Sequence, residues 1–254
     1  MWGVSWAHPK FGSIVASCGY DARVVIWKEH QVNNQPKWTK IKEHVGHSAS
    51  VNAVQFAPHE YGLVLCSASS DGTISLLTYT GLLTNLDGGW ETTSVLAHSI
   101  GVNACSWCPS TLPGSLVQTP AAVQGELGVR RIATGGCDNL VKIFKCENNT
   151  WTEEHALQGH TDWVRDVSFA PSIATTRTTL ASCSQDKNVL IWTTVDHKSW
   201  QRKPLKKGGF SDVVWRVSWS NGGNILAVST GDNLVTMWKE GVDGEFVQIA
   251  DVVE

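Results

Sequence analysis

The chain repeats itself. The pentapeptide WGVSW at residues 2–6 reappears as WRVSW at residues 215–219, and three looser copies lie between them. In register, each copy carries a Val or Cys that is followed two residues later by an aromatic residue. The pairs are Val4 and Trp6, Val54 and Phe56, Cys105 and Trp107, Val167 and Phe169, and Val217 and Trp219. A repeat of this kind is one supersecondary unit that stacks on its neighbours to bury a core, so the chain is an array.

The spacing and content of the repeats predict the fold. A turn aspartate recurs at Asp21, Asp71, Asp138, Asp186 and Asp232, with spacings of 50, 67, 48 and 46 residues. Such a period favours four-stranded propeller blades. Runs rich in β-branched residues alternate with Asp/Gly/Asn turns, and no helical apolar period is sustained. We therefore predict an all-β propeller of five four-stranded blades, forming a single domain over residues 1–254. The blades are expected at about 1–44, 51–97, 102–158, 163–206 and 213–252, with a long insertion at about 110–130 between the first two strands of the third blade.

Composition narrows the class of protein. The formal net charge of −3 argues against nucleic acid as the main partner. The 13 tryptophans fall at repeated positions, which predicts packing anchors between blades. We find no signal peptide and no apolar run long enough to cross a membrane. The seven cysteines are scattered without paired spacing, which predicts reduced thiols in the cytoplasm or nucleus.

The combination of Gly-His, a turn Asp and a strand-ending Trp resembles the WD-repeat family over essentially the whole chain. In that family a His, a Ser or Thr, the turn Asp and the Trp form a hydrogen-bonded chain within each blade. An aspartate suits the turn because its carboxylate accepts backbone N–H bonds. The resemblance implies structural networks of His160, Ser182, Asp186 and Trp192; His47, Ser67 and Asp71; His98, Thr134 and Asp138; Ser17, Asp21 and Trp27; and Asp232 and Trp238.

Features that could carry chemistry have simpler explanations. Cys105 and Cys108 resemble half of a zinc site, but residues three apart on a strand point to opposite faces, so we expect no metal. Arg165, between Asp162 and Asp166, could belong to a catalytic cluster, but an ion-pair network is the expected role. No nucleophile stands at motif spacing from a base. The sequence therefore predicts a protein that is not an enzyme and uses no cofactor.

Longer phrases resemble one branch of the WD-repeat family more closely. They are SSDGTISLLTY at 69–79, GGCDNL at 135–140, DWVRDV at 162–167 and ASCSQD at 181–186. These phrases are similar to the Sec-thirteen family, the small propeller subunits of the COPII outer coat. The resemblance implies a scaffold in endoplasmic reticulum to Golgi transport, peripheral on exit sites and vesicles, and in the Y-shaped nuclear pore complex. The implied partner is a coat subunit of the Sec-thirty-one type or a nuclear pore solenoid protein, which donates strands to an open six-bladed propeller.

The two ends of the array are relevant to how such a partner would bind. The last repeat has its own fourth strand at 246–252, so we expect uncovered strand edges that a partner could pair with. The predicted contact residues are Val213, Val214, Trp215, Val217 and Trp219. The family has one more blade before the residues that match Val4, and Met1 falls inside a strand, so we expect an N-terminally truncated array. The alternative is another WD-repeat interaction module, such as the second small nuclear pore propeller or a ubiquitin-ligase adaptor.

Overall fold

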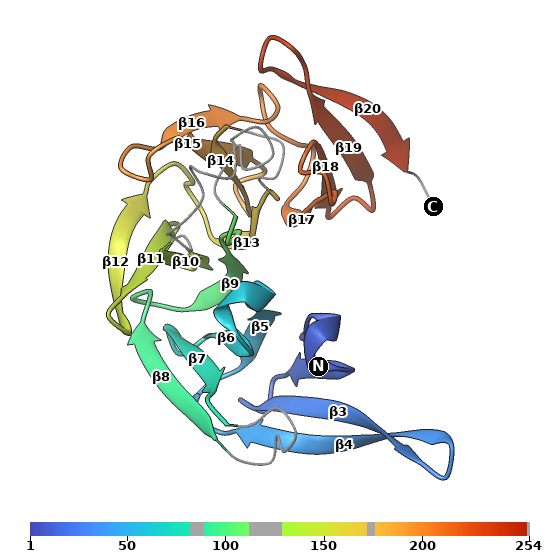
Figure 1. Ribbon diagram of the computed structural model, residues 1–254. Helices are drawn as coiled ribbons and strands as arrows, with labels where there is room; N and C mark the ends of the chain where they lie inside the picture. Colours follow the sequence, from blue (N-terminus) through green and yellow to red (C-terminus); the bar gives the residue numbers. More distant parts are fainter. Residues whose placement is uncertain (82–88, 112–128, 172–175, 253–254) are drawn as a thin grey trace, which may run out of the picture. The chain divides into compact units, whose positions relative to one another are not determined.

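The computed structural model describes residues 1–81, 89–111, 129–171 and 176–252 (Figure 1). Over these residues, 20 strands form five four-stranded antiparallel sheets, and within each sheet the strands follow one another in sequence order. The predicted all-β fold with five blades is confirmed. The chain divides into two compact units, Met1–Trp107 and Cys108–Glu254, which are described separately.

The first unit contains two complete blades and the first strand of the third. Its strands are β1 (Gly3–Trp6), β2 (Ile14–Cys18), β3 (Val24–Val32), β4 (Gln35–His44), β5 (Val51–Phe56), β6 (Val64–Ser69), β7 (Thr73–Tyr79), β8 (Trp90–Leu96) and β9 (Val102–Trp107). Two short 3₁₀ helices, Pro9–Phe11 and His59–Tyr61, follow β1 and β5 at equivalent places. The β3–β4 hairpin extends far beyond β2 (Figure 1). It is closed by Asn33 and Asn34, whose positive φ angles of 51° and 60° suit a tight hairpin turn.

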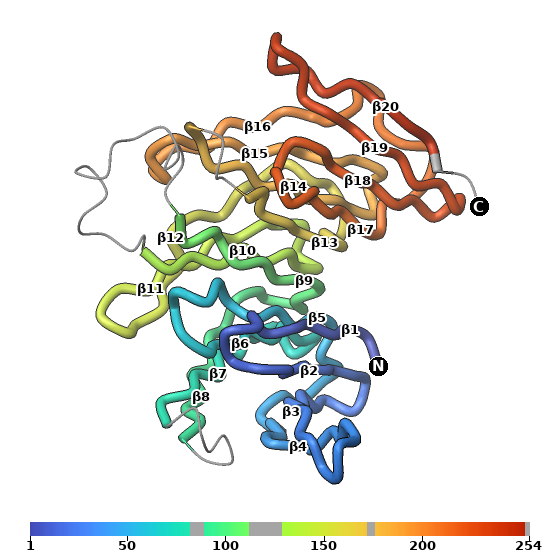
Figure 2. The backbone as a smooth tube through the Cα atoms, turned by 45° about the vertical axis from the view of Figure 1, so that its right-hand side comes forward, coloured from blue at the N-terminus to red at the C-terminus, as the bar shows by residue number. Residues whose placement is uncertain are grey.

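The second unit contains the rest of the third blade and the last two (Figure 2). Its strands are β10 (Arg130–Gly136), β11 (Val141–Glu147), β12 (Thr150–Leu157), β13 (Val164–Phe169), β14 (Thr178–Ser184), β15 (Val189–Thr194), β16 (Gln201–Pro204), β17 (Val214–Trp219), β18 (Ile225–Thr230), β19 (Val235–Glu240) and β20 (Phe246–Val252). Asn148 and Asn149 close the β11–β12 hairpin with positive φ angles of 50° and 60°. Most of the predicted insertion at 110–130 lies outside the described residues.

The core lies between neighbouring blades. In the first unit, Val54 and Phe56 of β5 belong to the same buried cluster as Ile14 and Ile26 of the first blade. In the second unit, Val217 of β17 shares a cluster with Ile191 of the fourth blade. The repeated Val position and its aromatic neighbour are therefore the residues through which each of these blades packs on the one before it. At about 25 cal/mol per Å² of buried apolar surface, these contacts are the main stabilising term between blades.

Hydrogen bonds reinforce the same seams. The residue after the repeated Val receives a bond from the next blade: the hydroxyl of Ser5 accepts the N–H of Phe56 at 3.0 Å, and Gln55 Oε1 accepts the N–H of Trp107 at 2.7 Å. The indole N–H of Trp219 donates to the carbonyl of Ser168 at 2.9 Å. At these three seams the first strand of one blade is thus aligned on that of its neighbour by polar contacts as well as by packing.

The expectation that the tryptophans anchor blade packing is partly wrong. Trp107, Trp192 and Trp238 are buried, but five others are exposed. The exposed side chains are those of Trp2, Trp6, Trp38, Trp163 and Trp215.

Candidate functional site

The fourth blade brings all four of its predicted network residues together. The indole N–H of Trp192 donates to the Ser182 hydroxyl at 2.8 Å, and that hydroxyl lies 2.8 Å from Nε2 of His160. Nδ1 of His160 lies 3.0 Å from Oδ2 of Asp186. Because the indole can only donate, the one hydroxyl proton of Ser182 is left for Nε2 of His160, and the imidazole proton sits on Nδ1, facing Asp186. The bonds therefore run in one direction, from Trp192 on β15 to Asp186 in the turn.

The carboxylate of Asp186 is also held by the backbone. It accepts the N–H groups of Thr161 and Asn188, each at 2.9 Å. Burial raises the pKa of this carboxyl, but the hydrogen bonds from His160 and from these backbone donors outweigh burial and lower the pKa to about 2. Asp186 is thus an ionised structural anchor at neutral pH.

The second blade builds the same network without a tryptophan. His47 lies 2.9 Å from the Ser67 hydroxyl through Nε2 and 3.1 Å from Asp71 through Nδ1. Leu77, at the Trp position, is fully buried and fills the space with an apolar side chain. Burial raises the pKa of Asp71, but donors that include the Thr73 hydroxyl, at 2.6 Å, lower it to about 2. Thr73 was not predicted, although a hydroxyl two residues after a turn Asp is a signal for this contact.

The first and third blades show parts of the pattern. In the first, the indole N–H of Trp27 donates to the Ser17 hydroxyl at 3.1 Å, whereas Asp21 lies in an exposed turn and accepts the N–H of Arg23 at 3.4 Å. In the third, His98 belongs to the first unit, and Thr134 and Asp138 belong to the second. Thr134 lies on β10, Asp138 in the turn that follows β10, and His98 in the connection from β8 to β9; His98 and Thr134 are buried. Their joint network stays a prediction.

The fifth blade replaces the missing hydroxyl by another route. Val228 stands where the other blades have Ser or Thr, and the indole N–H of Trp238 donates instead to the Thr236 hydroxyl at 2.8 Å. Phe210, at the His position, packs edge-on against Trp238 with ring centroids 5.9 Å apart. Asp232 accepts hydrogen bonds from Ser211 and Thr230. Thr236 was missed because it lies on the same strand as the tryptophan, two residues earlier, rather than on the neighbouring strand.

The predicted partner contact at the start of the fifth blade divides into buried and exposed residues. Val214 and Val217 are buried against the fourth blade, and Trp219 is half-buried beside Phe246, with ring centroids 6.2 Å apart. Val213 is also half-buried. Trp215 is exposed. A role of these residues in partner binding stays a prediction, and Trp215 is the one whose side chain faces solvent most openly.

Asp166 joins the fourth and fifth blades. Its carboxylate accepts the N–H of Val167 at 2.9 Å and the N–H of Val217, on the next blade, at 3.1 Å. Burial raises the pKa of this carboxyl to about 6, against the opposing effect of Arg216 and the two backbone donors. Arg165 makes no ion pair with either flanking aspartate. The expected ion-pair network is therefore wrong for Arg165, because both carboxylates turn to backbone N–H groups.

The first blade exposes an apolar face at one end of the array, where the sequence predicts uncovered strand edges but does not identify the residues. Val4 is 56% exposed and Trp6 is 64% exposed, whereas their equivalents in the second blade, Val54 and Phe56, are buried. Trp2 on the same side is 57% exposed. The Trp6 ring packs edge-on against Trp38, with centroids 5.8 Å apart. We call Trp2, Val4 and Trp6 the β1 face. Its exposure depends on what covers it, which the repeat pattern alone does not specify.

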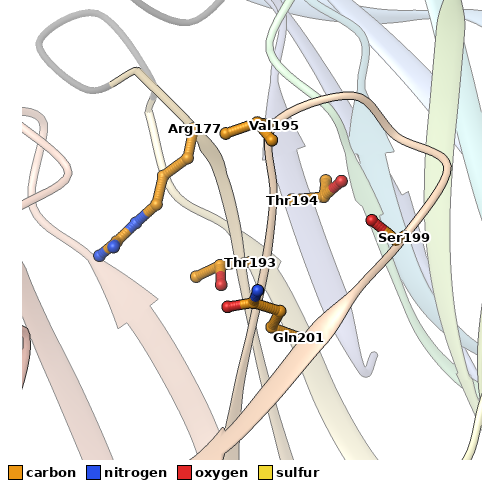
Figure 3. Close-up of a pocket in the computed structure, with 6 residues that line it drawn as sticks. All are labelled: Arg177, Thr193, Thr194, Val195, Ser199 and Gln201. Carbon is orange, nitrogen blue, oxygen red and sulfur yellow. The ribbon is translucent and has the colours of Figure 1, made fainter.

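A cavity of about 120 Å³ lies in the fourth blade (Figure 3). It is lined by Arg177, Thr193, Thr194, Val195, Ser199 and Gln201. The lining offers hydroxyls but no side chain that could act as a general base. The Arg177 guanidinium extends away from Thr194 and Ser199 and pairs with Glu240. The volume is below that of a typical small-molecule site.

Two further observations concern other classes of site. The described residues do not bring three or more His, Cys, Asp or Glu side chains into a group that could hold a metal ion. Within the same residues, there is no helix with the length and apolar character that a membrane crossing requires.

Comparison with known proteins identifies the family. The family described as "WD domain, G-beta repeat" matches residues 38–76, 151–193 and 202–239. The "Protein SEC13 homolog" of Drosophila melanogaster is 48% identical over 252 residues, which cover 98% of this chain and 68% of that protein. The "Protein transport protein SEC13" of Mycosarcoma maydis is 44% identical over 294 residues, with 99% and 79% covered.

The chain belongs to the SEC13 family of WD-repeat proteins. A further SEC13 protein, "Protein transport protein sec13" of Aspergillus clavatus, is 45% identical over 263 residues, with 100% of this chain and 85% of that protein covered. The expected resemblance is confirmed. The blade networks described above are therefore those of a SEC13-type propeller.

Proposed function

We propose that this chain is a non-catalytic scaffold subunit in protein transport, acting in a COPII-type coat between the endoplasmic reticulum and the Golgi and also in the nuclear pore. The relatives named as protein transport proteins support the first role. The nuclear pore role rests on the family resemblance. The titratable residues described above support a structural role, because Asp71 and Asp186 are committed to hydrogen bonds that hold their blades together.

The observation that carries the proposal is the β1 face. In the second blade the equivalent side chains, Val54 and Phe56, are buried against the blade before them. Val4 and Trp6 present the same apolar pattern to solvent. Isolated tryptophans on a surface need no explanation, but an ordered blade-packing face does. A sheet that packs on β1 as β5 packs on the first blade would bury it.

The family resemblance implies one further blade before the residues that match Val4, and that blade would also pack on this face. For the chain as given, the occupant that we propose is a blade contributed by an elongated partner of the Sec-thirty-one type, or by a nuclear pore solenoid protein. A partner that adds strands satisfies two requirements at once, because backbone groups pair within the added sheet while its apolar face covers β1. In this proposal the partner forms the framework of the cage, and this chain is a rigid unit bound to that partner. Membrane association then occurs through the assembled coat.

The test is binding of a recombinant Sec-thirty-one-type subunit to the chain and to two variants. In Val4→Ser/Trp6→Ser we expect binding to weaken at least about tenfold with an unchanged melting temperature, because both side chains are exposed. Val195→Ser is the matched control, since Val195 is 75% exposed but lies in the fourth blade. Undiminished binding by the double variant would rule out the β1 face as the partner surface.

A further inference from the structure

A second surface lies on the fourth and fifth blades, where an arginine is held between two tryptophans. The guanidinium carbon of Arg165 lies 5.1 Å from the ring centroid of Trp163 and 4.6 Å from that of Trp215. The two indoles are 43% and 46% exposed. Trp163 precedes β13 and Trp215 lies in β17, and these strands run side by side (Figure 1 and Figure 2). All three residues belong to the second unit.

Local backbone geometry places these side chains on the surface. The register of β13 with β14 shifts between Val164 and Asp166, and the register of β17 with β18 shifts between Val214 and Arg216. Each shift leaves one extra residue outside the ladder, Arg165 in the first case and Trp215 in the second. A β-bulge redirects the side chain of the extra residue. Two bulges at equivalent places on adjacent blades thus bring Arg165 and Trp215 together.

Among the described residues, no carboxylate pairs with Arg165. Nη2 of Arg165 donates to the side chain of Gln185, a neutral acceptor, and its Nε is buried without a hydrogen-bond partner. The nearest carboxylate to Arg216 is that of Asp166, with the closest atoms 4.0 Å apart. In contrast, Arg131 and Glu154 form a two-pronged pair at 2.7 and 3.0 Å.

The aspartate side chains around this surface accept hydrogen bonds from backbone N–H groups. Asp162 accepts the N–H of Trp163 at 2.7 Å, and Asp212 accepts the N–H of Val213 at 2.8 Å. Asp166 accepts two backbone N–H groups. Among the residues described, Arg165 therefore lacks a carboxylate partner, and Arg216 has the Asp166 carboxylate only at the limit of ion-pair distance.

We propose that Trp163, Arg165, Trp215 and Arg216 form a docking site for a peptide segment of a partner protein that carries a Glu or Asp beside an apolar side chain. A guanidinium fixed between rings is preorganised to donate hydrogen bonds to a carboxylate from the N–H groups that it leaves unused. The exposed indoles provide the apolar contact, and Trp and Arg are the residue types most enriched in binding hot spots. The net charge of −3 and the neighbouring aspartates disfavour a polyanion such as a nucleic acid more strongly than a peptide with one carboxylate. This site is separate from the β1 face and does not depend on the coat role.

The experiment selects ligands from a displayed library of random twelve-residue peptides against the whole chain, with the Arg165→Gln variant selected in parallel. We expect the enriched peptides to combine acidic with aromatic or aliphatic residues. Synthetic copies should bind Arg165→Gln and Trp215→Ala about thirtyfold more weakly, as for a hot-spot residue. Binding should weaken as salt rises.

Controls separate recognition from folding. Arg202→Gln is the matched control, because Arg202 is exposed, donates to the carbonyl of Gln158 and lies away from the indoles. It should bind like the parent chain, and each variant should keep the parent melting temperature. Arg165→Lys keeps the charge but loses the planar stack, and should bind weakly. Three results would overturn the proposal: no enrichment over the Arg165→Gln selection, enrichment of basic or uncharged peptides, or tighter binding of a single-stranded RNA probe than of any acidic peptide.

Discussion

Replacing Ser182 by alanine gives the sharpest test of the blade network. Ser182 is fully buried, and its hydroxyl is the central atom of the chain from Trp192 to His160. Its removal leaves an indole N–H and an imidazole nitrogen without partners in a site where both rings are buried. Each buried polar group left unpaired costs about 1–3 kcal/mol. We therefore expect Ser182→Ala to lower the free energy of unfolding by about 3 kcal/mol.

The assay is urea denaturation followed by tryptophan fluorescence and by circular dichroism, with the slope m compared between variants. Ser218→Ala is the control, because Ser218 is exposed on β17, and its effect should stay within about 0.5 kcal/mol. Thr236→Val in the fifth blade leaves one orphaned donor, that of Trp238, and should cost about 1–2 kcal/mol.

A double-mutant cycle isolates the shared hydrogen bond. Trp192→Phe removes the indole donor, so Ser182→Ala in that background leaves one orphaned group instead of two. The loss caused by Ser182→Ala should then shrink by about 1–2 kcal/mol. A loss for Ser182→Ala no larger than that for Ser218→Ala, or a coupling of zero in the cycle, would refute the directional network.

Three further predictions concern pH and backbone geometry. The pKa of Asp186 is lowered to about 2, so the folding stability that its ionised carboxylate contributes is present above the unfolded pKa of about 3.9 and is lost as pH falls through about 2. After allowance for solvent screening this contribution is about 1–2 kcal/mol. Urea titrations at pH 7 and pH 2.5 should therefore show that Asp186→Asn loses less stability on acidification than the parent chain. The pKa of Asp166 is raised to about 6, so folding stability is lost as pH rises from about 4 through 6. Between pH 4 and pH 7, Asp166→Asn should therefore gain about 2 kcal/mol of stability relative to the parent chain. A stability difference between the two proteins that does not change with pH would contradict this. Gly72→Ala should lower the free energy of unfolding by at least about 2 kcal/mol, because a Cβ there would lie 2.5 Å from the His98 carbonyl oxygen. Gly12 has a similar positive φ and no atom within 4 Å of the added Cβ, so Gly12→Ala should cost about 1 kcal/mol. Equal melting temperatures of the two variants would count against the steric argument.

Periodicity was enough to predict the blades because it reports packing directly. Val54 and Phe56 recur at their positions since each blade must offer the same face to its neighbour, and the turn residues Asn148 and Asn149 have the conformation that a short hairpin requires. The network of His160 and Ser182 could be predicted from the family pattern because its members lie at fixed offsets from Asp186.

Contacts between repeats were not predictable in the same way. Asp162 and Asp166 flank Arg165 in sequence, which favoured an ion-pair network, but strand bulges turned Arg165 toward Trp215, 50 residues away. Likewise, Val4 holds the same repeat position as the buried Val54 but is exposed. Whether a side chain is exposed depends on what packs against it, whereas the repeat pattern specifies only which residue stands at the position.

The most direct measurement of the central claim is amide hydrogen exchange of the chain with and without a recombinant Sec-thirty-one-type partner. The account predicts that protection on binding concentrates in residues 2–28, which carry β1, β2 and the start of β3, because the added blade covers the β1 face. A complex that forms with no change in residues 2–28, or with protection confined to residues 160–219, would contradict it.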